Sequence, residues 1–361
     1  MKEISACGIF GVMDRSGKRF NGEMIAEAMK NMYVRGNGLG AGYAVYGLYK
    51  DYKEYYCLHV LIENPDAKKK VDEFVNLNFD IVNDEEIPVN DEVDVVNPPL
   101  FWRYFVAPQK KGQDKKLSDD DYVVKKVIEI NTKIDGAYVI SSGKNMGVFK
   151  GIGFPWDIAE YFMIEEYKGY IWLGHSRFPT NTPGWWGGAH PFCILDWSVV
   201  HNGEISSYGT NKRYLEMFGY HCTLMTDTEV MAYIFDLLMR RQGLPIEVVA
   251  KILAPPMWDQ IDRMEGKMRK FYTALRMVYA PLLVNGPWTV IVAHHGEMFG
   301  LTDRIRLRPL TAGEKGDLLF LSSEESAIRA VCPNPDRVWT PHGGEPVIGR
   351  LDEKALKKVV K

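Results

Sequence analysis

The sequence has 361 residues and a mass of 41.2 kDa, enough to bury a sizeable core in one large domain or two ordinary ones. Its 44 Lys and Arg against 47 Asp and Glu leave a formal charge of −3, so neither nucleic acid nor a membrane surface is expected as a partner. Five scattered cysteines without a CxxC pair exclude a disulfide framework and a zinc ribbon. With no apolar run of about 18 residues and no secretory signal, we expect a cytoplasmic protein.

The hydrophobic pattern predicts alternating strands and helices along the chain. In chain order these are a strand at 8–13, a helix at 23–32, a helix at 119–130, strands at 137–142 and 146–150, strands at 170–173 and 197–201, helices at 226–242 and 261–279, and strands at 289–293 and 318–321. The strands at 137–142 and 146–150 are expected to form a hairpin around Gly143-Lys144-Asn145. Residues 52–121 are irregular, and we expect their charge runs to be solvated faces and loops of unassigned role. Strands at both ends with helices between predict one layered domain of α and β elements.

Cys7 is the cysteine whose position suggests chemistry, because almost nothing precedes it. A lone cysteine is usually unremarkable. If Met1–Ala6 were removed, however, Cys7 would carry a thiol and a free α-amine, whose pKa of about 7.7 to 8.0 suits a general base for its own side chain. The short segment ends in the small residue Ala6, which suits cleavage before a nucleophile. We therefore expect residues 1–6 to be a propeptide.

Three further motifs supply groups that could bind a substrate, and each also has an ordinary structural interpretation. Arg177 follows a predicted strand and could hold a carboxylate through its guanidinium, or be a surface charge. Asn202-Gly203 is the commonest hairpin-turn dipeptide, but its amide and backbone N–H could also stabilise an oxyanion. Thr226 and Glu229 are expected to form a helix capping box, which leaves Asp227 to meet an ammonium group.

Together these residues provide a nucleophile, a carboxylate clamp, an oxyanion hole and an acceptor for an amine. Such a set would recognise a free amino acid by its charged α-groups and cleave an acyl bond in its side chain. Glutamine is the obvious candidate.

Six ordered motifs resemble the class II glutamine amidotransferases of the N-terminal-nucleophile hydrolase fold. They are Cys7-Gly8-Ile9-Phe10-Gly11; Arg35-Gly36 with Gly40-Ala41-Gly42; Gly174-His175-Ser176-Arg177-Phe178-Pro179-Thr180-Asn181-Thr182; Ala189-His190-Pro191-Phe192; His201-Asn202-Gly203-Glu204-Ile205; and Thr226-Asp227-Thr228-Glu229. Within this family the sequence is most similar to the amidotransferase portion of glutamate synthase. That similarity also includes Phe271-Tyr272, Asn285-Gly286-Pro287-Trp288 and Leu307-Arg308-Pro309-Leu310.

The resemblance implies an α+β fold, a four-layer αββα sandwich, with residues 7–361 forming the amidotransferase domain. It implies that Cys7 attacks the glutamine amide and that Asn202 and Gly203 form the oxyanion hole. Arg177 would hold the α-carboxylate and Asp227 the α-ammonium. It further implies that Thr180 and Asn181 line the substrate pocket.

Members of the glutamate synthase branch carry a flavin- and iron-sulfur-containing synthase region after this portion, whereas this sequence ends at Lys361. We therefore expect no cofactor or metal in this chain, and FMN and an iron-sulfur cluster in a separate subunit that accepts ammonia. Two alternatives stay open: the glutaminase subunit of another amide-nitrogen synthase, such as methylglutamate synthase, and a non-catalytic glutamine-binding module that regulates a partner. The latter would require residues 1–6 to stay attached.

Overall fold

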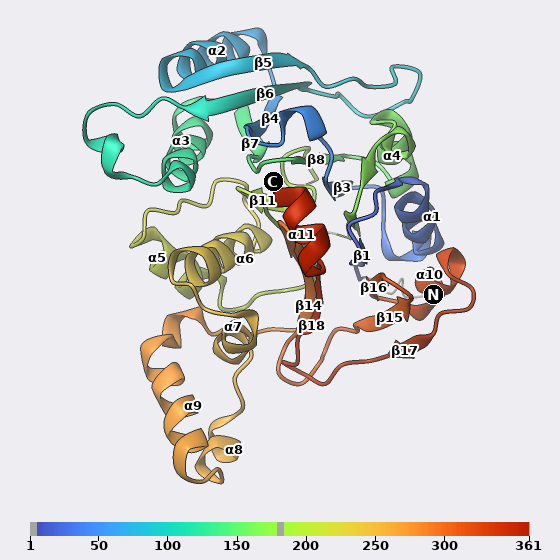
Figure 1. The fold of residues 1–361 in the computed structure, drawn as a ribbon, viewed down its shortest axis with the longest axis vertical. Coiled ribbons are helices and arrows are strands. Elements are labelled where there is room, and N and C mark those ends of the chain that lie inside the picture. The colour runs from blue at the N-terminus through green and yellow to red at the C-terminus, as the bar shows by residue number, and fades with distance from the viewer. Residues whose placement is uncertain (1–5, 179–183, 361) are drawn as a thin grey trace.

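Two antiparallel sheets lie face to face at the centre of the computed structural model, which describes residues 6–178 and 184–360 (Figure 1). The larger sheet has the order β17 (Arg337–Trp339), β15 (Thr311–Lys315), β16 (Leu318–Ser322), β1 (Gly8–Asp14), β10 (Ile171–Ser176), β3 (Ala41–Tyr46), β8 (Met146–Gly151). The smaller sheet has the order β11 (Phe192–Ile194), β12 (Trp197–Gly203), β13 (Trp288–His294), β14 (Glu297–Thr302), β18 (Val347–Arg350). Strand β1 is therefore central in the larger sheet, and β12 and β13 are inner strands of the smaller one.

A fully buried apolar layer fills the space between the two sheets. Ile9 and Leu173 from the larger sheet pack with Val200 and Ile291 from the smaller one. The sheets approach closely at Gly11, where an added Cβ would lie 2.9 Å from the Ile291 side chain. A larger residue at this position would separate the strands that carry the site.

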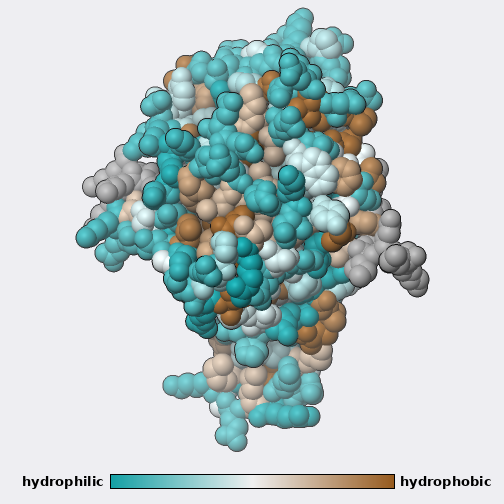
Figure 2. All heavy atoms as spheres, turned by 90° about the vertical axis from the view of Figure 1, so that its right-hand side faces the viewer, coloured by the Kyte–Doolittle hydropathy of each residue, from teal (hydrophilic) through white to brown (hydrophobic). Residues whose placement is uncertain are grey.

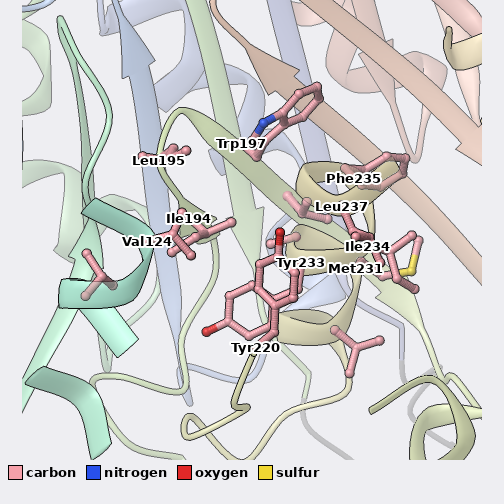
Figure 3. Close-up of a cluster of buried hydrophobic side chains, with 14 of the residues drawn as sticks. Val124, Ile194, Leu195, Trp197, Tyr220, Met231, Tyr233, Ile234, Phe235 and Leu237 are labelled. Atoms are coloured by element: carbon pink, nitrogen blue, oxygen red, sulfur yellow. The ribbon is translucent and has the colours of Figure 1, made fainter. Parts of the chain in front are cut away.

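Helices cover the outer face of each sheet. Over the larger sheet lie α1 (Glu23–Asn31), α4 (Pro155–Tyr161) and α10 (Glu325–Val331). Over the smaller sheet lie α5 (Tyr208–Glu216), α6 (Thr228–Phe235) and α7 (Ile246–Leu253). The close-up in Figure 3 shows the second of these layers, where Tyr233 and Ile234 of α6 pack beside Ile194 and Trp197 of the sheet. The four layers are those of an αββα sandwich, which confirms the predicted fold class.

Residues 52–121, whose sequence pattern is irregular, form regular elements in the structure. They contain three strands and a helix of an additional layer, seen at the top of Figure 1. The sheet order is β5 (Phe79–Glu86), β6 (Leu100–Pro108), β4 (Tyr56–Ile62), β7 (Ala137–Ser141), packed against α2 (Pro65–Asn78) and α3 (Asp119–Lys133). The charge runs are solvated faces of regular elements rather than loops, since Lys68–Lys70 lie on α2 and Asp84–Glu86 on the exposed end of edge strand β5.

Two other predicted elements differ in the structure. The strands β7 and β8 exist, but they do not pair as a hairpin, since β7 pairs with β4 and β8 with β3. The single helix predicted at 261–279 is instead α8 (Trp258–Asp262) followed by α9 (Gly266–Val278), and Gly266 at the junction has a φ of +54°. The remaining strands are the short pair β2 (Phe20–Asn21) and β9 (Lys168–Gly169), and the remaining α-helix is α11 (Glu353–Val360).

Among the described helices, none combines the length and the apolar character that crossing a bilayer requires. The face bearing α1 and α10 shows hydrophobic residues in small groups among hydrophilic ones (Figure 2).

Candidate functional site

One cavity of about 360 Å³ is lined by residues from four distant segments of the chain. Cys7, Arg177, Gly203 and Asp227, all predicted from sequence, line it. The sheets explain why they meet. Strands β1 and β10 are antiparallel, and Gly8 pairs with Ser176. Cys7 and Arg177 therefore lie next to each other, just beyond the same end of this strand pair. Gly203 ends β12, and Asp227 immediately precedes α6, which packs on β12.

The Cys7 thiol is held beside the Arg177–Phe178 backbone. Its Sγ accepts a hydrogen bond from the backbone N–H of Phe178 at 3.3 Å. Burial raises the pKa of the Cys7 thiol, and this effect is opposed by the Phe178 hydrogen bond and the Arg177 charge. Because desolvation is the largest of these effects, the thiol needs a base to become a nucleophile.

Arg177 is 3% exposed, and its backbone N–H donates to the carbonyl of Gly40 at 2.8 Å. Burial lowers the pKa of its guanidinium, while Cys7 and Asp227 act in the opposite direction. Gly40 leaves room for this side chain: its φ is +149°, and an added Cβ would lie 3.1 Å from Arg177 Cδ. The glycine-rich stretch before β3 therefore leaves space for the Arg177 side chain.

Asn202 and Gly203 are the last residues of β12, so the hairpin-turn interpretation of this dipeptide is wrong. They pair with Thr289 and Trp288 of β13. Asn202 is fully buried, and its Nδ2 donates to Ser323 Oγ over a long 3.4 Å, while its Oδ1 has no hydrogen-bond partner among the described residues. Gly203 has a φ of +134° and its Cα faces the Pro287 carbonyl so closely that an added Cβ would lie 1.8 Å from that oxygen.

Asp227 is the N-cap residue of α6, but its carboxylate does not cap the helix. Oδ2 accepts the backbone N–H of Ile205 at 2.9 Å, and Oδ1 accepts the Thr228 hydroxyl at 3.3 Å. Its side chain keeps 23% exposure toward the cavity. The predicted capping box is wrong, since the Glu229 carboxylate accepts the N–H groups of Thr223 and Leu224 rather than that of Thr226.

Sequence reasoning assigned no role to Thr228 or to the buried histidines around it. His190 and His201 both contact Thr228 Oγ1, and the rings of His175 and His190 stack with centroids 3.8 Å apart. Burial lowers the pKa of all three histidines, and His175 reaches about 3, so they are neutral at pH 7. His201 and Asn202 are neighbours on β12, so their side chains face opposite sides of the sheet, and of these two His201 lines the cavity whereas Asn202 does not.

Two predicted pocket residues, Thr180 and Asn181, lie outside the described residues. A larger cavity of about 970 Å³ beside α3 has none of the predicted site residues in its lining. Within residues 6–178 and 184–360, no group of three or more His, Cys, Asp or Glu side chains is arranged to hold a metal ion.

The family described as "Glutamine amidotransferases class-II" matches residues 61–222. This range contains the motifs around Arg177 and Asn202-Gly203, whereas Cys7 and Asp227 lie outside it. Over these residues the chain is similar to the class II glutamine amidotransferases.

Related proteins differ widely in how much of their length they share with this chain. An uncharacterized protein of Archaeoglobus fulgidus is 75% identical over 362 residues, which is 99% of this chain and 96% of the relative. A protein of Methanothermobacter thermautotrophicus, named as a candidate glutamine amidotransferase, is 26% identical over 331 residues, 90% of this chain and 93% of its own. An amidophosphoribosyltransferase of Methanocaldococcus jannaschii is 24% identical over 199 residues, 54% of this chain and 36% of that enzyme. A solved glutamine phosphoribosylpyrophosphate amidotransferase from B. subtilis gives a TM-score of 0.47 at 16% identity, over 95% of this chain and 47% of that one.

Proposed function

We propose that this chain hydrolyses the side-chain amide of glutamine to glutamate and ammonia, and delivers the ammonia to a separate synthase subunit. The observation that carries the proposal is the convergence of Cys7, Arg177, Gly203 and Asp227 on one cavity. A thiol, a cation, a backbone donor and a carboxylate from distant segments meet there, in an arrangement complementary to a zwitterionic amino acid with a side-chain amide.

The proposed reaction begins with activation of the Cys7 thiol. Once residues 1–6 are removed, the freed α-amine takes the thiol proton and the thiolate attacks the amide carbon. The resulting tetrahedral intermediate collapses to a glutamyl thioester as the amine returns the proton to the leaving nitrogen, which departs as ammonia. Water, deprotonated by the same amine, then attacks the thioester, releases glutamate and restores the thiol. The sum is glutamine plus water giving glutamate plus ammonia.

In this proposal different residues recognise the two ends of glutamine. Arg177 binds the α-carboxylate, and Asp227 the α-ammonium. At the other end, the Gly203 N–H and the Asn202 amide stabilise the oxyanion, a contribution worth about 2.7 to 4 kcal/mol for each donor. The long Asn202–Ser323 hydrogen bond is one that a developing negative charge can replace. Thr180 and Asn181 complete the pocket in this proposal.

We propose that the partner is the synthase subunit of a split glutamate synthase, holding the FMN and iron-sulfur cluster. The support is the set of motifs shared with that branch, including Phe271-Tyr272 and Asn285-Gly286-Pro287-Trp288. Purification of the tagged chain from its native host tests this part separately. A co-purifying flavin and iron-sulfur protein supports the assignment, whereas a partner without either group contradicts it.

Replacing the nucleophile tests the glutaminase reaction itself. Cys7→Ala is expected to lower kcat for glutamine hydrolysis at least about 10³-fold, because no thioester can form. Cys332→Ala is the matched control, since Cys332 lies after α10, outside the cavity lining, and should leave kcat unchanged. Normal ammonia release by Cys7→Ala, measured with a coupled ammonia assay, would refute the mechanism.

A further inference from the structure

The buried hydroxyl of Thr228, beside the cavity, contacts three polar groups. Thr228 is fully buried at the first position of α6. Its Oγ1 lies 2.9 Å from His190 Nε2, 2.9 Å from His201 Nδ1 and 3.3 Å from Asp227 Oδ1. Three partners are the most that one hydroxyl can satisfy, as it has one proton and two lone pairs.

Counting protons fixes the direction of each of these hydrogen bonds. An ionised carboxylate can only accept, so the Thr228 proton points to Asp227 Oδ1. Both histidine nitrogens must then carry a proton and donate to Thr228 Oγ1. Each neutral imidazole has only one proton, so His190 Nδ1 and His201 Nε2 are left as bare acceptors. These two atoms are indeed buried without a hydrogen-bond partner in the described parts of the chain.

The consequence for Asp227 is that both carboxylate oxygens are anchored. Oδ2 is held by the N–H of Ile205, at the start of the segment after β12, and Oδ1 by Thr228. The His201 ring contributes through Thr228 rather than as an ion pair, because its Nδ1 lies 3.8 Å from Asp227 Oδ1 and burial keeps it neutral. Without the hydroxyl, Oδ1 would lose its anchor and the carboxylate could turn away from the cavity.

We propose that Thr228 is a positioning residue, whose hydroxyl, oriented by His190 and His201, sets the Asp227 carboxylate to receive the α-ammonium of the substrate. This inference rests on the proposed function and assigns Thr228 no contact with the reacting amide. Losing the hydroxyl should therefore weaken substrate binding more than it slows chemistry.

The test separates binding from turnover. In Thr228→Val we expect KM for glutamine to rise about tenfold while kcat changes less than about threefold. Thr228→Ser, which keeps the hydroxyl and folds with only a methyl group removed, should restore KM to within about twofold. Thr302→Val is the matched control, since Thr302 is also fully buried with its hydroxyl bonded to a carbonyl, but lies on β14 outside the cavity lining.

The outcomes distinguish this role from the function on which it rests. If the wild type neither binds nor hydrolyses glutamine, the proposed function is overturned and the role of Thr228 with it. If the wild type is active, an unchanged KM in Thr228→Val overturns the positioning role alone. A raised KM in Thr228→Ser also overturns it, because that variant retains the hydroxyl, and this outcome does not require Thr228→Val to fold. Calorimetric titration of glutamine into Cys7→Ala, with and without Thr228→Val, should show the same loss of affinity in the absence of turnover.

Discussion

Arg177 and Asp227 give the cavity one cationic and one anionic wall, as a bound amino acid requires. Their environments differ: Arg177 is 3% exposed, whereas the Asp227 side chain is 23% exposed. The more exposed group forms a weaker ion pair with its ligand, because water screens the charge. Asp227 should therefore contribute a moderate part of the binding free energy and Arg177 a larger one.

Replacing the carboxylate with its amide should expose this contribution. Asp227→Asn keeps the size of the side chain and an oxygen for the Ile205 N–H, but removes the negative charge. We expect KM for glutamine to rise about tenfold, which corresponds to about 1.4 kcal/mol, with thermal stability almost unchanged. Asp259→Asn, on α8 and outside the cavity lining, is the control. Steady-state kinetics giving the same KM for both variants would remove Asp227 from the site.

Most of the candidate site could be predicted from the sequence, because its residues lie at the ends of recognisable strands. Cys7 precedes a strand near the start of the chain, and Asn202-Gly203 ends another. Thr228 and His190 were missed for a physical reason: their importance comes from a contact between residues 38 positions apart, which neither local pattern reveals. The predicted capping box of Glu229 was wrong because its carboxylate accepts hydrogen bonds from the backbone of residues 223–224 instead. The local pattern does not distinguish these two uses of the side chain.

At the scale of elements, the end of β12 places the proposed oxyanion hole. The strand delivers Asn202 and Gly203 in one register against β13, and the left-handed φ of Gly203 turns the chain at that point. The Pro287 carbonyl lies against Gly203 and accepts a hydrogen bond from the N–H of Glu204 at 3.0 Å. The geometry therefore depends on the absence of a side chain at position 203.

Gly203→Ala should damage both the fold and the activity. The added Cβ would lie 1.8 Å from Pro287 O, so the backbone must shift, and we expect a loss of at least about 2 kcal/mol in the free energy of unfolding. Gly209→Ala in α5 is the matched control: the nearest atom to its new Cβ is 3.4 Å away, and helix propensity predicts a gain of about 0.5 to 1 kcal/mol. Denaturant titration measures both. Equal stabilities of Gly203→Ala and the wild type would contradict the strained geometry at β12.

Element existence was predicted better than element pairing. Strands at β1, β10, β12 and β13 follow from local hydrophobic runs. The β7–β8 hairpin was wrong because the strands belong to different sheets, and sheet membership is decided by partners far away in the chain, β4 and β3. The break between α8 and α9 escaped the periodicity because apolar residues continue across it.

At the scale of the whole molecule, buried neutral histidines link stability to pH. Burial lowers the pKa of His59 and His175 to about 3 each, and also lowers those of His190 and His201. Their ordinary pKa of 6.5 returns on unfolding, so below pH 6.5 the unfolded chain binds more protons than the folded one. Stability is therefore retained above pH 6.5 and lost as the pH falls below it.

The expected slope is steep enough to measure. Each fully buried histidine contributes up to about 1.4 kcal/mol per pH unit well below pH 6.5, and less close to it. Denaturant titrations between pH 7.5 and 5.5 should show falling stability. His59 lies at the contact between β4 and β8, outside the cavity lining. His59→Gln should reduce the dependence of the unfolding free energy on pH by the contribution of one histidine. A stability that is flat from pH 7.5 to 5.5 would contradict the burial of these rings in their neutral form.

We propose that Cys7 becomes the nucleophile once residues 1–6 are removed. The most direct test is mass spectrometry of the protein from its native host after treatment with a glutamine analogue carrying an electrophilic side-chain carbon. We expect a chain that begins at Cys7 and carries one label, located on Cys7 by peptide mapping and prevented by excess glutamine. A glutamine-hydrolysing protein that retains residues 1–6, or that carries the label on another residue, would contradict it.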